Sequence, residues 1–304
     1  MKEFFVWILM ASVFLSSSDT NKADEYFNSG VRKHNSKDYQ GAIEDFTKVI
    51  EINPKDADAH YNRGSAKTEI TDYLGAIADY SKAIEINPKH FKAYYSRGFS
   101  KIKIQDYHGA IADFNKAIEI NPQDAHAYYG RGYTRHVLQD HHNAIKDYNK
   151  AIKLKPQYAD AFYSRGLAKS ETHDYYGAIA DNTKAIEINP QYAVAYFNRG
   201  TVNFILQDFY GAIADYNKAI KLNPQNADAY FSRGDAKARL EDYRGAIIDF
   251  TMAIEINPQY ADAFYVRGLA KLSIGQKDSG CLDLSRAREL GSIHVNEGIK
   301  RHCN

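Results

Sequence analysis

This 304-residue chain has almost no net charge, only one long apolar stretch and no signature of catalysis. The 39 basic and 38 acidic residues leave a net charge of +1 and are spread along the sequence, so nucleic acid and anionic membrane surfaces are poor candidates as partners. No glycine-rich phosphate loop follows a strand, and no nucleophile elbow occurs. The 11 histidines come with no cysteine or carboxylate spacing that would complete a metal site. We therefore expect no catalysis, no metal and no cofactor.

Only one stretch is strongly apolar, and it stands at the start of the chain. Lys2 precedes an apolar run at 4–15, which is followed by small residues and by the polar segment 19–22. This order is typical of a secretory signal peptide, here residues 1–18 with cleavage before Asp19. An uncleaved anchor is the alternative, but the run is short of the roughly 20 residues that a spanning helix needs. The sequence predicts an exported protein, either periplasmic or secreted.

Proline is scarce, and all 7 prolines follow one period that eight of the 19 glycines share. The 7 prolines stand 34 residues apart, at Pro54, Pro88, Pro122, Pro156, Pro190, Pro224 and Pro258. Glycines keep the same interval at Gly30, Gly64, Gly98, Gly132, Gly166, Gly200, Gly234 and Gly268. A fixed period of this length indicates a tandem array whose units pack on their neighbours.

The segment 91–124 shows what one unit forms, and its residues are numbered here as positions 1 to 34. Apolar residues at positions 17, 20, 21, 24, 27 and 28 share one face of an α-helix, because their spacings are three, four and seven. Asp106 precedes this helix as a candidate N-cap, and Pro122 ends it. The first half of the unit predicts a second helix. Each unit is therefore a helical hairpin, and the fold class is all-α.

This pattern resembles the tetratricopeptide repeat (TPR) family. The matching residues in the segment 91–124 are Tyr94, Gly98, Ala110, Phe114, Ala117 and Pro122. The resemblance implies a right-handed α-solenoid of about eight helix-turn-helix repeats with a C-terminal capping helix. Repeats 1 to 8 are expected at 23–56, 57–90, 91–124, 125–158, 159–192, 193–226, 227–260 and, in degenerate form, 261–294, with the cap at 295–304.

Two charged positions recur with the repeat. Position 7 is arginine in seven units, at Arg63, Arg97, Arg131, Arg165, Arg199, Arg233 and Arg267. Position 23 is aspartate in all eight, at Asp45, Asp79, Asp113, Asp147, Asp181, Asp215, Asp249 and Asp283. Both positions lie about equally far from the turn, so we predict an Arg–Asp pair inside each hairpin. A pair that fixes the helix register is favoured over a ladder that binds a ligand.

The only two cysteines are Cys281 and Cys303. Counted from the turn at 291–292, they lie ten residues back and eleven residues on, so antiparallel helices would bring them to the same level. In an oxidising compartment we predict a disulfide between them. Two unpaired thiols are the alternative.

In the TPR family, the first helices of successive units line a concave surface, where positions 2, 5, 9, 12 and 13 usually contact a bound peptide. Position 5 is aromatic in every unit and either packs between helices or anchors a ligand. Positions 9, 12 and 13 vary between units, so we expect them to determine which ligand binds. The predicted groove residues are Tyr61, Tyr95, Phe99, Ile102, Tyr129, Tyr133, Val137, Tyr163, Leu167, Phe197, Phe204, Ile205 and Phe231.

The resemblance thus implies a non-catalytic scaffold that binds an extended peptide or helix of a partner protein, with no nucleic acid and no small-molecule substrate. A clamp for a C-terminal carboxylate, known in the family, is not expected, because only Asn62 and Lys92 fit its pattern. The alternative is a glycan-binding module of the cell envelope that uses the groove tyrosines. Self-association through an exposed end of the array is a third hypothesis.

Overall fold

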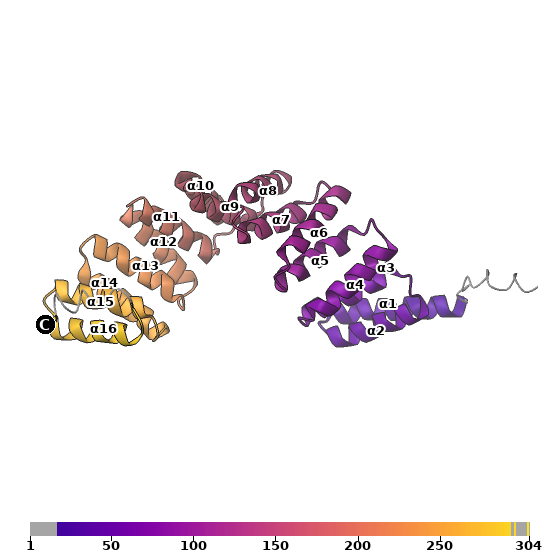
Figure 1. Cartoon of the computed structure of the whole chain (residues 1–304), viewed down its shortest axis with the longest axis horizontal. Helices are drawn as coiled ribbons and strands as arrows, with labels where there is room; N and C mark the ends of the chain where they lie inside the picture. Colours follow the sequence, from indigo (N-terminus) through magenta and orange to yellow (C-terminus); the bar gives the residue numbers. More distant parts are fainter. Residues whose placement is uncertain (1–16, 293–294, 296–302, 304) are drawn as a thin grey trace, which may run out of the picture. The chain divides into compact units, whose positions relative to one another are not determined.

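The computed structural model describes residues 17–292, 295 and 303. Within them, all regular structure is α-helical (Figure 1). The helices are α1 Ser17–Asn35, α2 Tyr39–Ile52, α3 Ala57–Glu69, α4 Tyr73–Ile86, α5 Phe91–Lys103, α6 Tyr107–Ile120, α7 Ala125–Val137, α8 His141–Leu154, α9 Ala159–Glu171, α10 Tyr175–Ile188, α11 Ala193–Ile205, α12 Phe209–Leu222, α13 Ala227–Arg239, α14 Tyr243–Ile256, α15 Ala261–Ser273 and α16 Lys277–Glu289.

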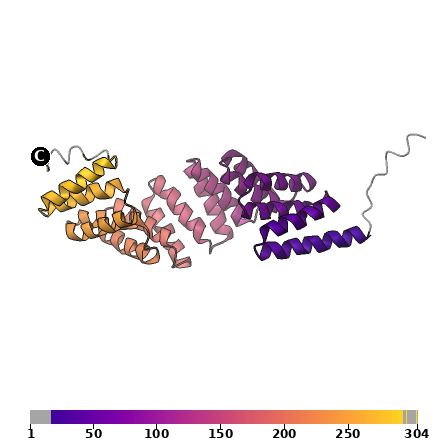
Figure 2. The same cartoon turned by 90° about the horizontal axis from the view of Figure 1, so that it is seen from below.

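The helices form two compact units, α1–α7 and α8–α16, and the boundary falls within predicted repeat 4. In each unit, helical hairpins stack in sequence order (Figure 1, Figure 2). First helices of successive repeats also touch one another, as α3 touches α5 and α11 touches α13. Among the described residues, second helices of the same unit do not touch one another. The first helices are therefore the more closely spaced layer of each unit, which is the inner side of a curved stack.

The predicted start and end of the second helix are confirmed in repeat 3. The backbone N–H of Gly109 donates to Asp106 Oδ1 at 2.9 Å, which satisfies one of the free donors at the start of α6. At the other end, Asn121 has left the helical region, with φ −130° and ψ 88°, because Pro122 follows it. The second helices of most other repeats end in the same way, so proline sets the length of the hairpin.

The core of each hairpin is made of small residues around one ring. In repeat 3, Ala110, Phe114 and Ala117 are fully buried. A Cβ atom placed on Gly98 would lie 3.0 Å from the Phe114 ring. Glycine at position 8 therefore lets the first helix approach the ring at position 24, and the stacking of repeats buries both.

Position 15, in the turn between the two helices, has a left-handed backbone. Gln105 has φ 63°, and six equivalent non-glycine residues have φ between 61° and 66°. Only repeat 8 has glycine there, Gly275 with φ 80°. The left-handed conformation costs a non-glycine residue roughly 1 kcal/mol, which the packing of the two helices outweighs.

The two ends of the chain are described in part. α1 begins at Ser17, ahead of the predicted start of repeat 1, while the predicted signal peptide lies outside the described residues except for its last two. Of the predicted cap, only Val295 and Cys303 are described, and Val295 is fully buried against α16. Among the described residues, no helix is both long and apolar enough to cross a bilayer.

Candidate functional site

The predicted groove residues all lie on first helices. In the first unit, α3 carries Tyr61, α5 carries Tyr95, Phe99 and Ile102, and α7 carries Tyr129, Tyr133 and Val137. In the second unit, α9 carries Tyr163 and Leu167, α11 carries Phe197, Phe204 and Ile205, and α13 carries Phe231. All of them therefore belong to the inner layer of their own unit.

The aromatic row at position 5 packs into the scaffold. The Tyr61 ring lies 5.8 Å from the buried Tyr80 ring, and the Tyr95 ring lies 6.1 Å from the buried Phe114 ring, measured between centroids. Phe231 stacks on Tyr260 at 5.0 Å. Burial raises the pKa of the Tyr95 hydroxyl to about 12. These rings are half-buried, so each holds its hairpin together while one part of it faces the inner layer.

The first unit contains a hollow of about 310 Å³ between three first helices, α3, α5 and α7. We call it the α3–α5–α7 pocket. It is lined by Tyr61, Phe91, Lys92, Tyr95, Ser96, Asp124 and His126. It brings two predicted groove residues, Tyr61 and Tyr95, together with five residues outside the predicted set.

Phe91 and Lys92 distinguish this pocket from the other repeats. Position 1 is alanine in every repeat except repeat 3, which has Phe91, and position 2 is aspartate in most repeats but Lys92 here. The Phe91 ring lies 6.3 Å from the Tyr95 ring, in a stacked arrangement. Phe91 stands at position 1, outside the positions that the family resemblance assigns to the groove, and Lys92, at position 2, fits only the pattern of the carboxylate clamp. In the sequence, Phe91 is the single departure from alanine at position 1, whereas position 2 also differs from aspartate in repeats 4 and 6.

The pocket has charged groups of both signs beside its rings. Lys92 supplies an ammonium group, and Asp124 a carboxylate. Asp124 Oδ1 accepts the backbone N–H of Ala127 at 2.8 Å as the N-cap of α7, which fixes the direction of this side chain. The pocket can therefore take an apolar group on its rings and polar groups at its rim.

Outside the pocket, some of the apolar groove residues pack on rings of their own hairpin, and others are exposed. Phe99 packs on Phe114 at 5.2 Å and Phe204 on Phe209 at 5.4 Å, so both rings support the hairpin. Tyr133 and Ile205 are 40% and 46% exposed and remain available to a partner. Asn62, one of the two residues that fit the carboxylate clamp, donates to the Asp58 carbonyl in its own helix at 2.8 Å.

The predicted Arg–Asp pairs are confirmed in the hairpins of Arg63, Arg97, Arg165, Arg199, Arg233 and Arg267. Nε donates to one carboxylate oxygen at 2.8 to 3.0 Å, and the terminal nitrogen donates to the other at 2.5 to 2.8 Å. A lysine four residues after the arginine joins most of these carboxylates, as Lys101 joins Asp113 at 2.9 Å. The pairs lie between the two helices of one hairpin and so fix their register.

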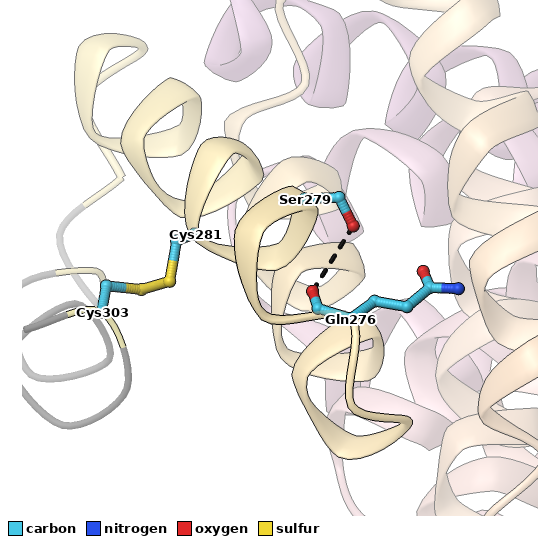
Figure 3. Close-up of a disulfide and its surroundings, with 4 residues drawn as sticks. All are labelled: Gln276, Ser279, Cys281 and Cys303. Atoms are coloured by element: carbon cyan, nitrogen blue, oxygen red, sulfur yellow. Dashed lines mark hydrogen bonds between the residues drawn. A yellow bond between two sulfur atoms is a disulfide. The ribbon is translucent and has the colours of Figure 1, made fainter.

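Cys281, on α16, forms a disulfide with Cys303, and their Cα atoms lie 5.7 Å apart (Figure 3). No group of three or more His, Cys, Asp or Glu side chains among the described residues is arranged to hold a metal ion.

These observations define the class of protein as an α-solenoid of stacked helical hairpins. A family model described as "TPR repeat" matches residues 33–69, 101–139, 136–172 and 203–241. A second, described as "Tetratricopeptide repeat", matches residues 57–90 and 227–260. Together these segments make up more than half of the sequence. The chain belongs to the tetratricopeptide repeat family.

No curated protein matches the sequence. Among solved structures, the MamA protein is 28% identical over 57% of this chain and 95% of its own, with a TM-score of 0.52. YrrB, described as a TPR protein with an unusual peptide-binding site, is 24% identical over 60% of this chain and 95% of its own, with a TM-score of 0.52. The pilF protein of Pseudomonas aeruginosa is 18% identical over 69% of this chain and 97% of its own, with a TM-score of 0.62.

The family and these similarities identify the chain as a TPR scaffold. Scaffolds of this kind serve protein–protein interaction and are generally non-catalytic.

Proposed function

We propose that the chain binds an extended segment of a partner protein along its first helices, with the α3–α5–α7 pocket as the main anchor. The pocket is the observation that carries this proposal. It lies in the inner layer of the first unit, is formed by three successive repeats, and contains two residues, Phe91 and Lys92, that no other repeat has at the same positions.

The chemistry of the pocket suits a peptide. The rings of Tyr61, Phe91 and Tyr95 offer an apolar surface for one side chain of the partner. Lys92 can donate to a carbonyl or carboxylate oxygen, and the second oxygen of Asp124 can accept a backbone N–H. Backbone carbonyl and N–H groups alternate along an extended main chain, so one peptide can offer both partners. Helix packing fixes the rings beforehand, so little ordering opposes binding.

The test begins with capture of partners from a cell-envelope extract by residues 19–304, followed by titration of the bound segment as a synthetic peptide. The variant Phe91→Ala/Lys92→Asp gives repeat 3 the alanine and aspartate found in repeats 1, 2, 5, 7 and 8, so the hairpin is expected to fold. We expect the peptide to bind this variant at least tenfold more weakly, about 1.4 kcal/mol.

The matched control is Tyr176→Ala on the second helix α10, where the side chain is 79% exposed. This variant should bind the peptide like the parent chain. Equal affinity of the parent and the repeat 3 variant would contradict the proposal. Retention on insoluble polysaccharide without a captured protein would favour the glycan-binding alternative.

We also propose that the chain is exported and cleaved before Asp19. The apolar run at 4–15 supports this, and a disulfide such as Cys281–Cys303 is typical of oxidising compartments. Intact mass spectrometry of the chain from the envelope fraction tests the proposal. A mass that includes the first 18 residues would contradict it.

A further inference from the structure

Most hairpins of this chain hold an arginine side chain between a ring and a carboxylate. In repeat 3, the Arg97 guanidinium lies 5.6 Å from the centroid of the Tyr94 ring and binds both carboxylate oxygens of Asp113, at 2.9 and 2.6 Å. The same ring-to-arginine distance is 5.4 to 5.8 Å in the repeats of Arg165, Arg199, Arg233 and Arg267. The ring at position 4 and the aspartate at position 23 thus form a receptor for a guanidinium group.

Repeat 1 has the receptor without the arginine. It keeps Tyr26 at position 4 and Asp45 at position 23, but position 7 is Ser29. A hollow of about 470 Å³ lies at this place, lined by Glu25, Tyr26, Asn28, Ser29, Arg32 and Asp45. We call it the repeat 1 hollow.

We propose that the repeat 1 hollow binds the guanidinium group of an arginine side chain from a partner protein, held against the Tyr26 ring and the Asp45 carboxylate. The hollow is formed by α1 and α2 alone and shares no residue with the α3–α5–α7 pocket. This second binding site does not depend on the function proposed above.

The Asp45 carboxylate has the charge that the receptor needs. It is 3% exposed, and burial opposes its ionised form, but hydrogen bonds from Lys33 and Ser29 outweigh burial and keep the pKa of this carboxyl below its usual value. Lys33 Nζ lies 2.7 Å from Oδ2, just as Lys101 Nζ lies 2.9 Å from Asp113 Oδ2 in repeat 3. In repeat 3, that lysine and the arginine share one carboxylate, so Lys33 is compatible with an added guanidinium.

Glu25 adds a second acidic group to the hollow, since position 3 is alanine in every other repeat. Besides Lys33, the cations Arg32 and Lys48 oppose the incoming charge. Arg32 lies on the rim, and Lys48 Nζ lies 4.8 Å from the Tyr26 centroid and 3.9 Å from Asp45 Oδ1. The Lys48 side chain is 48% exposed. Its contacts show that ring and carboxylate attract a cation, and such exposed pairs are weak enough to be displaced.

In an internal repeat, the preceding repeat covers the side of the hairpin on which the arginine lies. In repeat 1, a partner can reach the hollow from that side. In repeat 3, the third nitrogen of Arg97 donates to Ser81 of the preceding repeat at 2.9 Å. Among the described residues, α1 packs only on α2 and α3, at one end of the first unit (Figure 1). An arginine that enters the hollow would therefore bring its own acceptor for this nitrogen from the partner.

The experiment is a titration of the full chain, isotopically labelled, with N-acetyl-arginine amide, followed by NMR signals of Tyr26 and Ser29. N-acetyl-lysine amide is the matched probe, because it carries the same charge without the planar fork that pairs with a carboxylate. We expect saturable shifts with the arginine probe and at least tenfold weaker binding of the lysine probe.

Two variants with internal precedents sharpen the test. Ser29→Arg supplies the guanidinium from position 7, as in the other repeats, and should abolish binding of the arginine probe. Lys48→Met copies Met252, the residue at this position in repeat 7, and should increase the affinity by removing the competing cation. Asn35→Arg adds the same charge at an exposed position outside the hollow and should change the affinity less than about threefold.

Circular dichroism confirms that each variant is folded before it is titrated. Equal binding of both probes, binding that survives Ser29→Arg, or no response of Tyr26 and Ser29 to the arginine probe would each overturn the proposal.

Discussion

The guanidinium of Arg97 binds both carboxylate oxygens of Asp113, although the two residues lie on different helices. The same guanidinium also donates to Ser81 in the preceding hairpin. Asp113 is 3% exposed, and the Arg97 side chain is 17% exposed. One arginine therefore sets the register within its own hairpin and joins that hairpin to its neighbour, which couples the stability of adjacent repeats.

Replacing Asp113 by asparagine should destabilise the first unit. Arg97 and Lys101 would keep their charges but lose the carboxylate that both contact. Because leaving a buried charge without its partner costs about 3–5 kcal/mol and these cations are partly exposed, we expect a loss of about 2–3 kcal/mol. Urea denaturation followed by circular dichroism measures it.

The control for this variant is Glu119→Gln, which removes the exposed pair between Lys116 and Glu119. It should leave the unfolding free energy almost unchanged, because exposed ion pairs contribute little. A loss as small for Asp113→Asn as for Glu119→Gln would show that the buried pair contributes no stability.

Acid should destabilise the chain through the buried carboxyl of Asp79. Burial raises the pKa of Asp79, but hydrogen bonds from Arg63 and Lys67 outweigh it and lower the pKa below the ordinary value of 3.8. The unfolded state therefore binds the proton more readily, so this stabilisation is complete above pH 3.8 and is lost as the pH falls through the lower, folded value. Unfolding free energies measured between neutral pH and about pH 2 should decline in that window.

The variant Asp79→Asn provides the comparison for the pH series. It removes one titrating group, so its curve should start lower at neutral pH and decline less steeply than that of the parent chain. Parallel curves would mean that Asp79 does not contribute to the acid sensitivity.

Asn182 occupies the place of the core ring in repeat 5. It is fully buried, its Nδ2 donates to the Ala178 carbonyl at 2.8 Å, and its Oδ1 has no hydrogen-bond partner among the described residues. Asn182→Phe would restore a ring and remove the unsatisfied oxygen. Repeat 1 already has a ring at this place, Phe46, and the repeat after it has asparagine at position 6, as does the repeat after repeat 5. We expect a gain of about 1–3 kcal/mol in unfolding free energy.

The reverse change in the next repeat, Tyr216→Asn, should lose about 3–5 kcal/mol, because the Tyr216 ring is 1% exposed. Thermal denaturation of both variants compares the two sites directly. Destabilisation by Asn182→Phe would show that the surrounding side chains have closed over the space that a ring needs.

Cys303→Ser should loosen the last hairpin. The disulfide holds residue 303 against α16 (Figure 3). Val295 packs on Leu284 and Ala287 of the same helix. Loss of a disulfide that closes a loop of this length costs about 2–4 kcal/mol. Hydrogen exchange of α15 and α16 amides should therefore become faster, while that of α9 to α12 stays the same.

Dithiothreitol provides the control for the cysteine variant. It should increase exchange in the parent chain to the level of Cys303→Ser and have no effect on the variant itself. A parent chain whose exchange does not respond to reduction would show that the cap is held by packing alone.

The sequence by itself determined the repeat architecture. A period of 34 residues specifies the hairpin through local backbone chemistry: in repeats 1 to 7 an aspartate precedes the second helix and a proline follows it, as Asp106 and Pro122 do in repeat 3. The Arg97–Asp113 pair followed in the same way, because the short turn between the two helices leaves only one register. The number and class of the helices needed no information from distant residues.

Only the tertiary structure decided where a ligand can bind. The α3–α5–α7 pocket unites Tyr61, Phe91, Lys92 and Asp124 from consecutive repeats, and the angle between stacked hairpins, which no local pattern specifies, brings them together. The same holds for the repeat 1 hollow, because Ser29 is unremarkable in the sequence until the structure shows that Tyr26 and Asp45 surround the space where other repeats place arginine. A periodic sequence determines the fold through contacts that every repeat shares, whereas binding sites arise where packing exposes the residues that differ.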